Sequence, residues 1–395
     1  MESILKIKSI HYIGIIFGII AIGTESLIMS PLLKEIGESF GNDIGMTGWA
    51  VSAYGIALAI TAPAIGLLCR KTARVHLMLV GMLVFFIASL WCGISNSFSG
   101  LVLARALCGM GAGLYIPSCY AWIGDHVPYE IRAQVMGRIM AGWSMALVLG
   151  VPFGTVLAEA FGWRSAFFAI SAISLLALLG IFLLPIFKNE IVSRPSLRDE
   201  VHSILTGPSS KILRINFLNM LGFYSCYSFL GIATRESLQI GSALFGMLVI
   251  CYGMGLMLST MNGNRLDKLG KQKALWGSNF GLMAIFLLLP MSFTHIAAMA
   301  LCMGAWGIFQ GIAQTSTATL MTLSAGKSRG FALACMSSTT YLAVALGAGA
   351  GGWMMQYNGF SSITLMSLGT VFSVHFLIKN LLINEKIEII TPTTK

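Results

Sequence analysis

Long apolar stretches recur from one end of the chain to the other, and they constrain its fold more than any other feature. Hydrophobic residues make up 56% of the 395 residues, and charged residues only 10%. A soluble domain of this length cannot bury so much apolar surface, so lipid must solvate much of the chain. A run of about 20 apolar residues is long enough to cross a hydrocarbon core of about 30 Å as an α-helix. We therefore predict an all-α membrane protein.

Twelve segments meet this length requirement, and we predict that each is a transmembrane helix. They lie at 10–33, 47–69, 75–95, 100–123, 136–158, 165–187, 213–234, 243–264, 273–293, 296–322, 330–355 and 361–383. The first segment is longer than the apolar core of a signal peptide and lacks a convincing cleavage site. We therefore expect it to be retained as a helix.

The basic residues gather on one side of this predicted topology. With an even number of helices and a cytoplasmic amino terminus, 21 of the 25 lysines and arginines fall inside the cell. The exceptions are Lys34, Arg105, Arg164 and Arg235. Because cytoplasmic loops carry such an excess, we expect both termini in the cytoplasm. The net charge of +10 then reflects topology, and we expect no nucleic-acid partner.

The two halves of the chain share a pattern at an offset of 197 residues. Leu-Gly-x-x-x-Gly, followed by glycine and an aromatic residue, occurs at 149–163 and again at 346–360. Parallel six-helix repeats are a transporter architecture in which the substrate binds near the midplane between the halves. We predict an amino-terminal six-helix bundle at 1–187, a cytoplasmic linker at 188–212 and a carboxyl-terminal six-helix bundle at 213–395.

Glu25 is the one acidic residue deep inside a predicted helix. A carboxylate at bilayer depth is costly unless it is protonated, paired or exposed to water. We interpret Glu25 as a proton-binding residue; the alternative is a packing acid that bonds to a neighbouring helix. Arg105 is expected within about 3–5 Å of the same depth and is its predicted partner, unless it extends to the outer interface. Burial favours a protonated carboxyl and a nearby arginine favours an ionised one, a balance that suits proton exchange.

Polar residues in the second half are candidates for contact with a solute. The seventh and tenth segments supply Asn216, Asn219, Tyr224, Tyr227, Trp306, Gln310, Gln314 and Thr317. Those in the tenth segment recur every three or four residues, on one face of a helix. Amides and aromatic rings around a cavity suit a planar or hydroxylated solute. The alternative for each residue is a hydrogen bond between helices. Weaker first-half candidates are Tyr54, Tyr115 and Trp143, and we predict a packing role for His375.

The fifth segment carries a ridge of small residues that predicts close helix packing. Gly142, Ala146, Gly150 and Gly154 are spaced by four, with Pro152 beside them. Small residues at this spacing let another helix approach closely, and a proline tends to bend a helix. The ridge is either ordinary packing or a surface that moves during function.

These stretches resemble the major facilitator superfamily, and within it the twelve-helix drug–proton antiporter branch. Residues 101–111 resemble the family's fourth-helix motif with its buried arginine, and 142–154 resemble the fifth-helix motif associated with exporters. The opening Gly23-Thr24-Glu25 is similar to the first helix of bacterial exporters of drugs, nucleosides or sugars. The resemblance implies a fold of two six-helix pseudo-repeat bundles with both termini cytoplasmic.

The signature loop of this family occurs twice, and one copy departs from the pattern. Residues 263–273 match it well and include Gly263, Asp267 and Gly270. In the first copy, after Gly66, the expected aspartate is Arg70. An arginine cannot favour the positive end of a helix dipole. We therefore expect Asp267 to carry more of the latch role that the family assigns to this loop.

The resemblance implies a secondary active exporter in the bacterial cytoplasmic membrane, driven by proton entry, whose halves rock about a central site. Its partners would be a small solute, the proton and the lipid bilayer, with no cofactor beyond the proton gradient and a monomer as the working unit. The alternatives are a facilitator or proton symporter for a sugar- or nucleoside-like solute, and a membrane sensor with a transporter fold. The sequence holds no nucleophile–base set, metal cluster or phosphate loop, so we predict no enzymatic activity and no metal.

Overall fold

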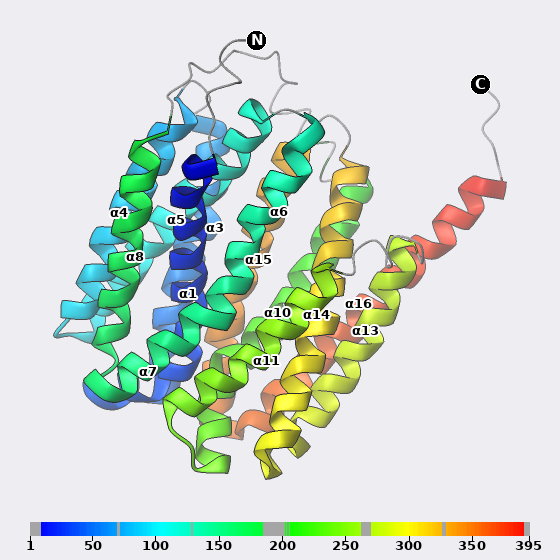
Figure 1. The fold of residues 1–395 in the computed structure, drawn as a ribbon. Coiled ribbons are helices and arrows are strands. Elements are labelled where there is room, and N and C mark those ends of the chain that lie inside the picture. Colours follow the sequence, from blue (N-terminus) through cyan, green and yellow to red (C-terminus); the bar gives the residue numbers. More distant parts are fainter. Residues whose placement is uncertain are drawn as a thin grey trace.

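The computed structural model describes residues 9–68, 72–127, 129–184, 202, 204, 206–261, 270–325 and 329–390. The chain forms a bundle of long helices that run alternately up and down (Figure 1). The first group is α1 (Ser9–Phe40), α2 (Ile44–Thr47), α3 (Trp49–Leu68), α4 (Arg74–Ile94), α5 (Phe98–His126), α6 (Tyr129–Met145), α7 (Val151–Phe161) and α8 (Arg164–Phe182). The second is α10 (Pro208–Leu238), α11 (Ser242–Met261), α13 (Lys271–Leu288), α14 (Ile296–Ser324), α15 (Arg329–Asn358) and α16 (Phe360–Ile390).

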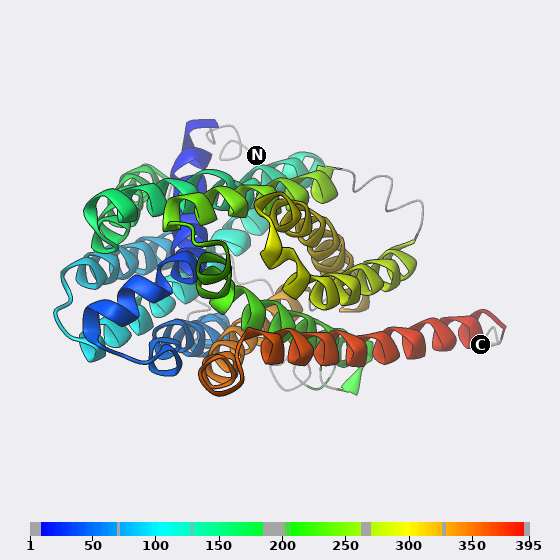
Figure 2. The ribbon, with the colours of Figure 1, turned by 90° about the horizontal axis from the view of Figure 1, so that it is seen from below.

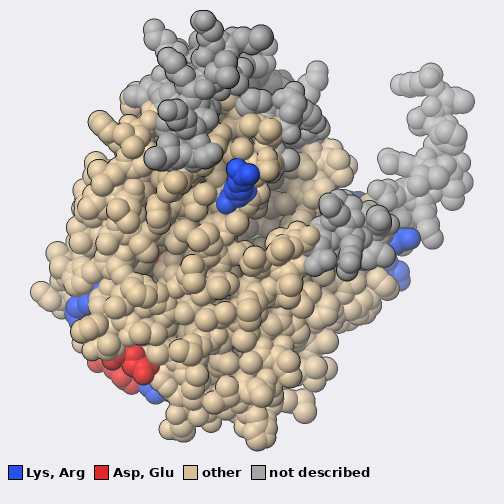
Figure 3. Space-filling view, in the orientation of Figure 1, with Lys and Arg blue, Asp and Glu red and all other residues tan. Residues whose placement is uncertain are grey.

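The described residues contain 11 helical spans that are long and apolar enough to cross a membrane. They coincide with eleven of the twelve predicted segments, which establishes a multi-pass membrane protein. The remaining predicted segment, 213–234, falls within the 31-residue helix α10, which is not among the 11. This helix begins at Pro208, inside the predicted linker 188–212. The face in Figure 3 is almost free of charged side chains over its middle, as lipid contact requires.

Two glycines that share the 197-residue offset have matching backbone conformations. Gly162 separates α7 from α8 with φ of 86°, and Gly359 separates α15 from α16 with φ of 73°. Glycine adopts positive φ at no steric cost, whereas other residues do so rarely. The repeated glycine therefore makes equivalent sharp turns in the two halves.

The fifth predicted helix is interrupted by one wide, π-type turn at Ala146–Gly150 that separates α6 from α7. Pro152 follows directly. A proline has no N–H to donate to the carbonyl four residues earlier, and its ring crowds that carbonyl. A local π turn accommodates both effects, so the predicted bend at Pro152 is present as a change of helix type.

The two groups of helices meet mainly at one end of the bundle, which we call the closed end. Here α1 packs against α10, α2 and α3 against α15, and α7 against α11. The closed end is the lower end in Figure 1, where α1 finishes at Phe40 and α10 at Leu238. Seen from below, most helices of the first group lie on the left and most of the second on the right (Figure 2). Toward the opposite end, Figure 3 shows a recess in the surface.

Candidate functional site

Glu25 and Arg105 form an ion pair between α1 and α5. The Nη1 atom of Arg105 contacts the Oε1 atom of Glu25, and both side chains are fully buried. The predicted partnership is thus present in the structure. Among the acids of defined burial, all except Glu25 are at least partly exposed. The Glu25–Arg105 pair is therefore the central charged feature of the described bundle.

Arg105 also ties these helices to α3. Its Nε atom donates to the backbone oxygen of Ala50 (3.0 Å), and its Nη1 donates to the backbone oxygen of Glu25 (3.4 Å). The guanidinium carbon lies 4.8 Å from the centre of the Tyr54 ring, in a cation–π contact. Glu25 Oε2 and Arg105 Nη2 have no hydrogen-bond partner among the residues described. Buried polar atoms are normally bonded, so Glu25 Oε2 is available to accept a proton or a hydrogen bond, and Arg105 Nη2 is available to donate to water or a solute.

Polar side chains from both groups of helices converge beside this pair. Ser26, next to Glu25, faces Tyr54 of α3 and Tyr224 of α10. The ring of Tyr54 lies 6.2 Å from that of Tyr341 on α15. The buried pair is therefore adjacent to the boundary between the two groups of helices, where an alternating-access transporter would bind its substrate.

A cluster of stacked and edge-packed rings lies in the second group of helices. Phe223 stacks on Tyr227 (5.4 Å between centroids, 13° between planes) and on Tyr252 (5.7 Å, 29°). Trp306 packs edge-on against Phe223 at 5.3 Å and against Phe286 at 5.4 Å. The structure thus brings the predicted candidates Tyr227 and Trp306 together through Phe223.

Two of the predicted amide candidates, Gln310 and Asn219, lie one turn away from this cluster. Gln310 follows Trp306 by one turn on α14 and is fully buried, and neither of its amide atoms has a partner among the described residues. Asn219 precedes Phe223 by one turn on α10, and its Oδ1 is likewise unpartnered there. The indole N–H of Trp306 is in the same situation. Gln314 differs, because its Nε2 lies 3.9 Å from the sulfur of Met220.

Other polar candidates have local partners, as the packing alternative predicted. The amide of Asn216 donates to Thr339 (3.0 Å) and Thr340 (2.9 Å) on α15. Thr317 donates to the carbonyl of Ala313 in its own helix. The remaining first-half candidates and His375 also contact neighbours: Tyr115 donates to Ile15, Trp143 to Tyr120, and the His375 ring packs on Trp276 and Phe280.

The small-residue ridge of the fifth segment packs against α1. A Cβ atom added at Gly150 or Gly154 would overlap the side chain of Thr24 or Ile28. In the second group, Gly347 and Gly351 approach α10 closely in the same manner. The ridge is therefore a close helix contact in this conformation.

Of the signature-loop residues, Gly270 has φ of 85° and directly precedes α13. Gly66 lies near the end of α3, and Arg70, Gly263 and Asp267 lie outside the described residues.

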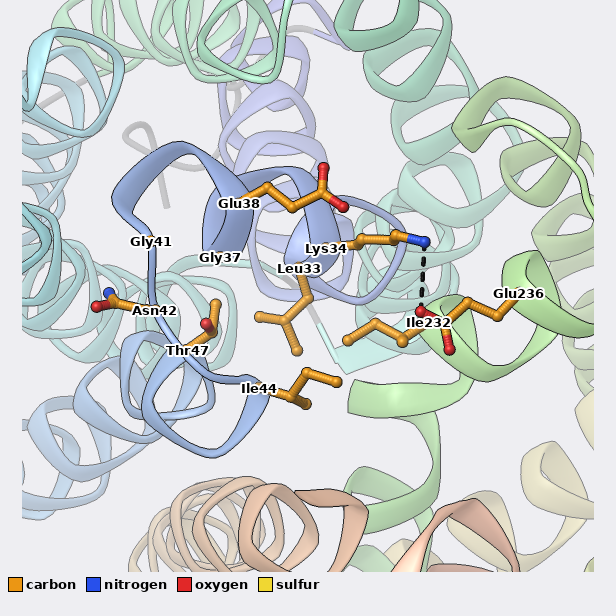
Figure 4. A pocket seen from close by; sticks show the side chains of 10 residues that line it. All are labelled: Leu33, Lys34, Gly37, Glu38, Gly41, Asn42, Ile44, Thr47, Ile232 and Glu236. Atoms are coloured by element: carbon orange, nitrogen blue, oxygen red, sulfur yellow. Dashed lines mark ion pairs between the residues drawn. The ribbon is translucent and has the colours of Figure 1, made fainter.

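Ion pairs between α1 and α10 at the closed end were missed by the sequence reasoning. Arg235 makes a two-point contact with Glu35 (2.6 and 2.8 Å), and Lys34 pairs with Glu236 at 3.3 Å. Figure 4 shows the second pair beside a cavity of about 170 Å³ that is lined by α1, α2 and α10. This cavity lies at the closed end, in a different place from the Glu25–Arg105 pair. The sequence did carry a signal for these pairs, because Lys34 and Arg235 are two of the four basic residues that do not fall on the predicted cytoplasmic side.

The rings Phe223, Tyr252 and Tyr341 were also missed. They sit in apolar stretches, where an aromatic residue is the ordinary filler of a core. Only the helix packing shows that they contact the predicted candidates Tyr54, Tyr227 and Trp306.

Apolar spans around a buried acid–arginine pair define a multi-pass membrane protein of the transporter class. The profile of the Major Facilitator Superfamily matches residues 15–210 and 212–389, and the chain belongs to that superfamily.

Three comparisons place it further within known proteins. The chain is 29% identical over 375 residues to the uncharacterized MFS-type transporter YwfA of Bacillus subtilis (strain 168), covering 92% of this chain and 90% of that one. It is 23% identical over 375 residues to a probable sugar efflux transporter of Pasteurella multocida (strain Pm70), covering 93% and 91%. The crystal structure of the human organic anion transporter MFSD10 (TETRAN) shares the fold, with a TM-score of 0.71 at 18% identity over 94% of this chain and 98% of that one.

Proposed function

We propose that this protein is a proton-coupled exporter of a small organic solute, working by alternating access in a bacterial cytoplasmic membrane with both termini inside. The observation that carries the proposal is the buried Glu25–Arg105 pair beside the boundary between the two groups of helices. The similarity to a probable sugar efflux transporter favours export. Solute and proton would each bind during opposite steps of one cycle.

The pair supplies an energetic reason for coupling. When Glu25 binds a proton, Arg105 loses its counter-charge while it remains buried. Removing one partner of a buried pair costs about 3–5 kcal/mol, whereas two conformations of a protein differ by only a few kcal/mol. Protonation is therefore strong enough to change which conformation is favoured.

The position of Glu25 on α1 connects this change to the rest of the molecule. Leu27 and Ser30 of the same helix contact Tyr227 of α10, through the Tyr227 hydroxyl to the Leu27 oxygen (3.3 Å) and the Ser30 hydroxyl to the Tyr227 oxygen. A shift of α1 around Arg105 would act directly on the contact between the two groups of helices.

Transport by purified protein in proteoliposomes tests the proposal. Glu25→Gln keeps the size of a protonated carboxyl but cannot exchange a proton. We expect it to abolish solute movement driven by a pH gradient while preserving exchange of labelled for unlabelled solute. Glu38→Gln is the matched control, because Glu38 lies on the same helix but is exposed at its end, and it should leave both activities unchanged.

Several outcomes decide against the proposal. Well-folded Glu25→Gln protein that still moves solute against its gradient would remove Glu25 from the coupling mechanism. Solute that moves with protons in the same direction identifies a symporter, and movement that never exceeds equilibrium identifies a facilitator. Binding without any flux identifies a sensor.

A further inference from the structure

Resting on the proposed exporter function, we infer that the solute is uncharged, rich in hydrogen-bonding groups and flat on one face, and that each cycle exchanges one solute for one proton. Sugars, glycosides and nucleosides share this chemistry. The exchange would then move one net positive charge into the cell per solute exported.

The charge inventory around the site carries the first part of this inference. Among side chains of defined burial, the buried charged ones are Glu25, Arg74 and Arg105. Arg74 begins α4 and is 3.6 Å from Asp125, away from the central pair. Glu25 and Arg105 neutralise each other. A charged solute would find no free counter-charge there and would lose its hydration uncompensated.

The titratable groups around the Glu25–Arg105 pair are few, which limits the number of protons exchanged. Among the residues whose side chains are described, Arg105 contacts Glu25, and Tyr54 of α3 and Cys108 of α5 lie beside Arg105. Tyr224 of α10 faces Ser26, the neighbour of Glu25. An arginine does not release its proton in proteins, and tyrosine and cysteine ordinarily keep theirs at neutral pH. Glu25 is thus the one carboxyl in this set, and it carries one proton.

The unpartnered amides point to hydrogen bonding as the mode of solute recognition. Gln310 offers two donors and one acceptor in a plane, and Asn219 and Trp306 add an acceptor and a donor. Leaving a buried polar group unbonded is unfavourable, so a solute that bonds these atoms would be bound selectively. The rings of Phe223, Tyr252 and Trp306 lie one turn away and are buried against one another in this conformation; aromatic rings suit the flat apolar face of a sugar or a base.

An imposed membrane potential tests the charge moved per cycle. Proteoliposomes contain equal labelled adenosine, or equal labelled arabinose, on both sides and no pH difference. A potassium gradient with valinomycin then makes the interior negative by about 100 mV. Antiport of one proton for one neutral solute should deplete the internal label, with a limit of about 50-fold, because one charge gains about 2.3 kcal/mol per 100 mV and each tenfold ratio requires about 1.4 kcal/mol. The random orientation of the protein does not alter this limit.

A panel of probes and one matched pair of variants test the solute class. Labelled tetraphenylphosphonium and salicylate serve as the cationic and anionic members beside adenosine and arabinose. Gln310→Leu should raise the adenosine or arabinose concentration for half-maximal exchange about tenfold. Thr319→Val should not, because the Thr319 hydroxyl bonds within α14 to the Thr315 carbonyl (2.8 Å).

Each outcome separates this inference from the proposed function. If a pH gradient drives a neutral probe but the membrane potential does not, the inferred movement of one net charge per cycle is wrong, and the proposed exporter function still stands. If charged probes exchange and no neutral probe does, the solute class is wrong; exchange of salicylate would mean that an anion displaces Glu25 from Arg105. If neither gradient drives any probe, or if negative potential causes accumulation, the proton antiporter itself is refuted.

Discussion

Replacing Arg235 with methionine should weaken the closed end. This arginine, on α10, donates to Glu35 Oε2 (2.8 Å) and to the backbone oxygen of Pro31 (2.8 Å), and it pairs with Glu35 Oε1 at 2.6 Å, all on α1. These contacts can form only when the two groups of helices meet. Methionine keeps most of the length and the apolar stem of the side chain but removes both hydrogen bonds and the ion pair.

The size of the effect follows from the geometry of the pair. A hydrogen bond to a charged group contributes about 1.5–3 kcal/mol, but exposed ion pairs contribute much less. Arg235 is 12% exposed and Glu35 is 28% exposed, so we expect a net loss of about 2 kcal/mol for the closed end, or about a 30-fold change in the equilibrium. A protein that is closed about 99% of the time would then be closed roughly three-quarters of the time.

Distance measurements between spin labels detect this shift. Labels at Met46 on α2 and Ser237 on α10, both exposed, span the closed end in a cysteine-free background. Arg235→Met should add a longer distance to the distribution. Arg164→Met is the control, since Arg164 bonds to the Ser95 oxygen (2.9 Å) within the first group of helices.

A double-mutant cycle makes the assignment specific. Glu35→Gln should produce a smaller shift in the same direction, and adding it to Arg235→Met should cause little further change because the two residues share one interaction. An unchanged distance distribution in well-folded Arg235→Met protein would show that these contacts do not hold the closed end.

Three further predictions follow from the same structure. On α5, Gly109→Ala should lower the stability measured by melting in detergent by about 1–3 kcal/mol, because the added Cβ would overlap the Tyr54 backbone oxygen. Gly124→Ala is the control, because there is open space around Gly124. Equal melting temperatures for the two variants would refute the packing argument. Glu159→Ala should lengthen the closed-end distances modestly, by removing the acceptor for the Ala243 N–H in the first turn of α11 (2.7 Å), a capping loss of about 1 kcal/mol; unchanged distances in well-folded Glu159→Ala protein would contradict this. An impermeant thiol reagent on intact cells should label a cysteine at Asp43 but not at Lys268, and the reverse pattern would invert the proposed orientation.

The sequence predicted the spans and the central pair well because both follow from the cost of polar groups in lipid. That cost confines charges to helix ends, which defines the apolar segments, and it makes the exception at Glu25 conspicuous. Depth along two antiparallel helices then identifies Arg105 as the partner, and the structure confirms the contact. The proton role of this pair, the domain boundaries and the latch at Asp267 stay predictions.

The solute candidates were harder to separate from packing residues. Asn216 and Gln310 look alike in sequence, since each is an amide in a helix with apolar neighbours. The structure gives Asn216 two threonine partners on α15 and leaves Gln310 without one among the described residues. Which neighbours meet an amide depends on how separate helices pack, and helix periodicity specifies only the face on which the amide lies.

Pro31 shows how a local rule in the sequence produces a contact between the two groups of helices. It lies within α1 and has no N–H to donate to the carbonyl of Leu27, four residues earlier. That freed carbonyl accepts a hydrogen bond from the Tyr227 hydroxyl of α10 (3.3 Å), while the carbonyl of Pro31 itself accepts from Arg235. Leu27 is also about 200° around the helix from Glu25, so these two residues lie on nearly opposite sides of α1. One rigid helix can therefore connect the charge state of Glu25 to the closed end without any intervening chain of side chains.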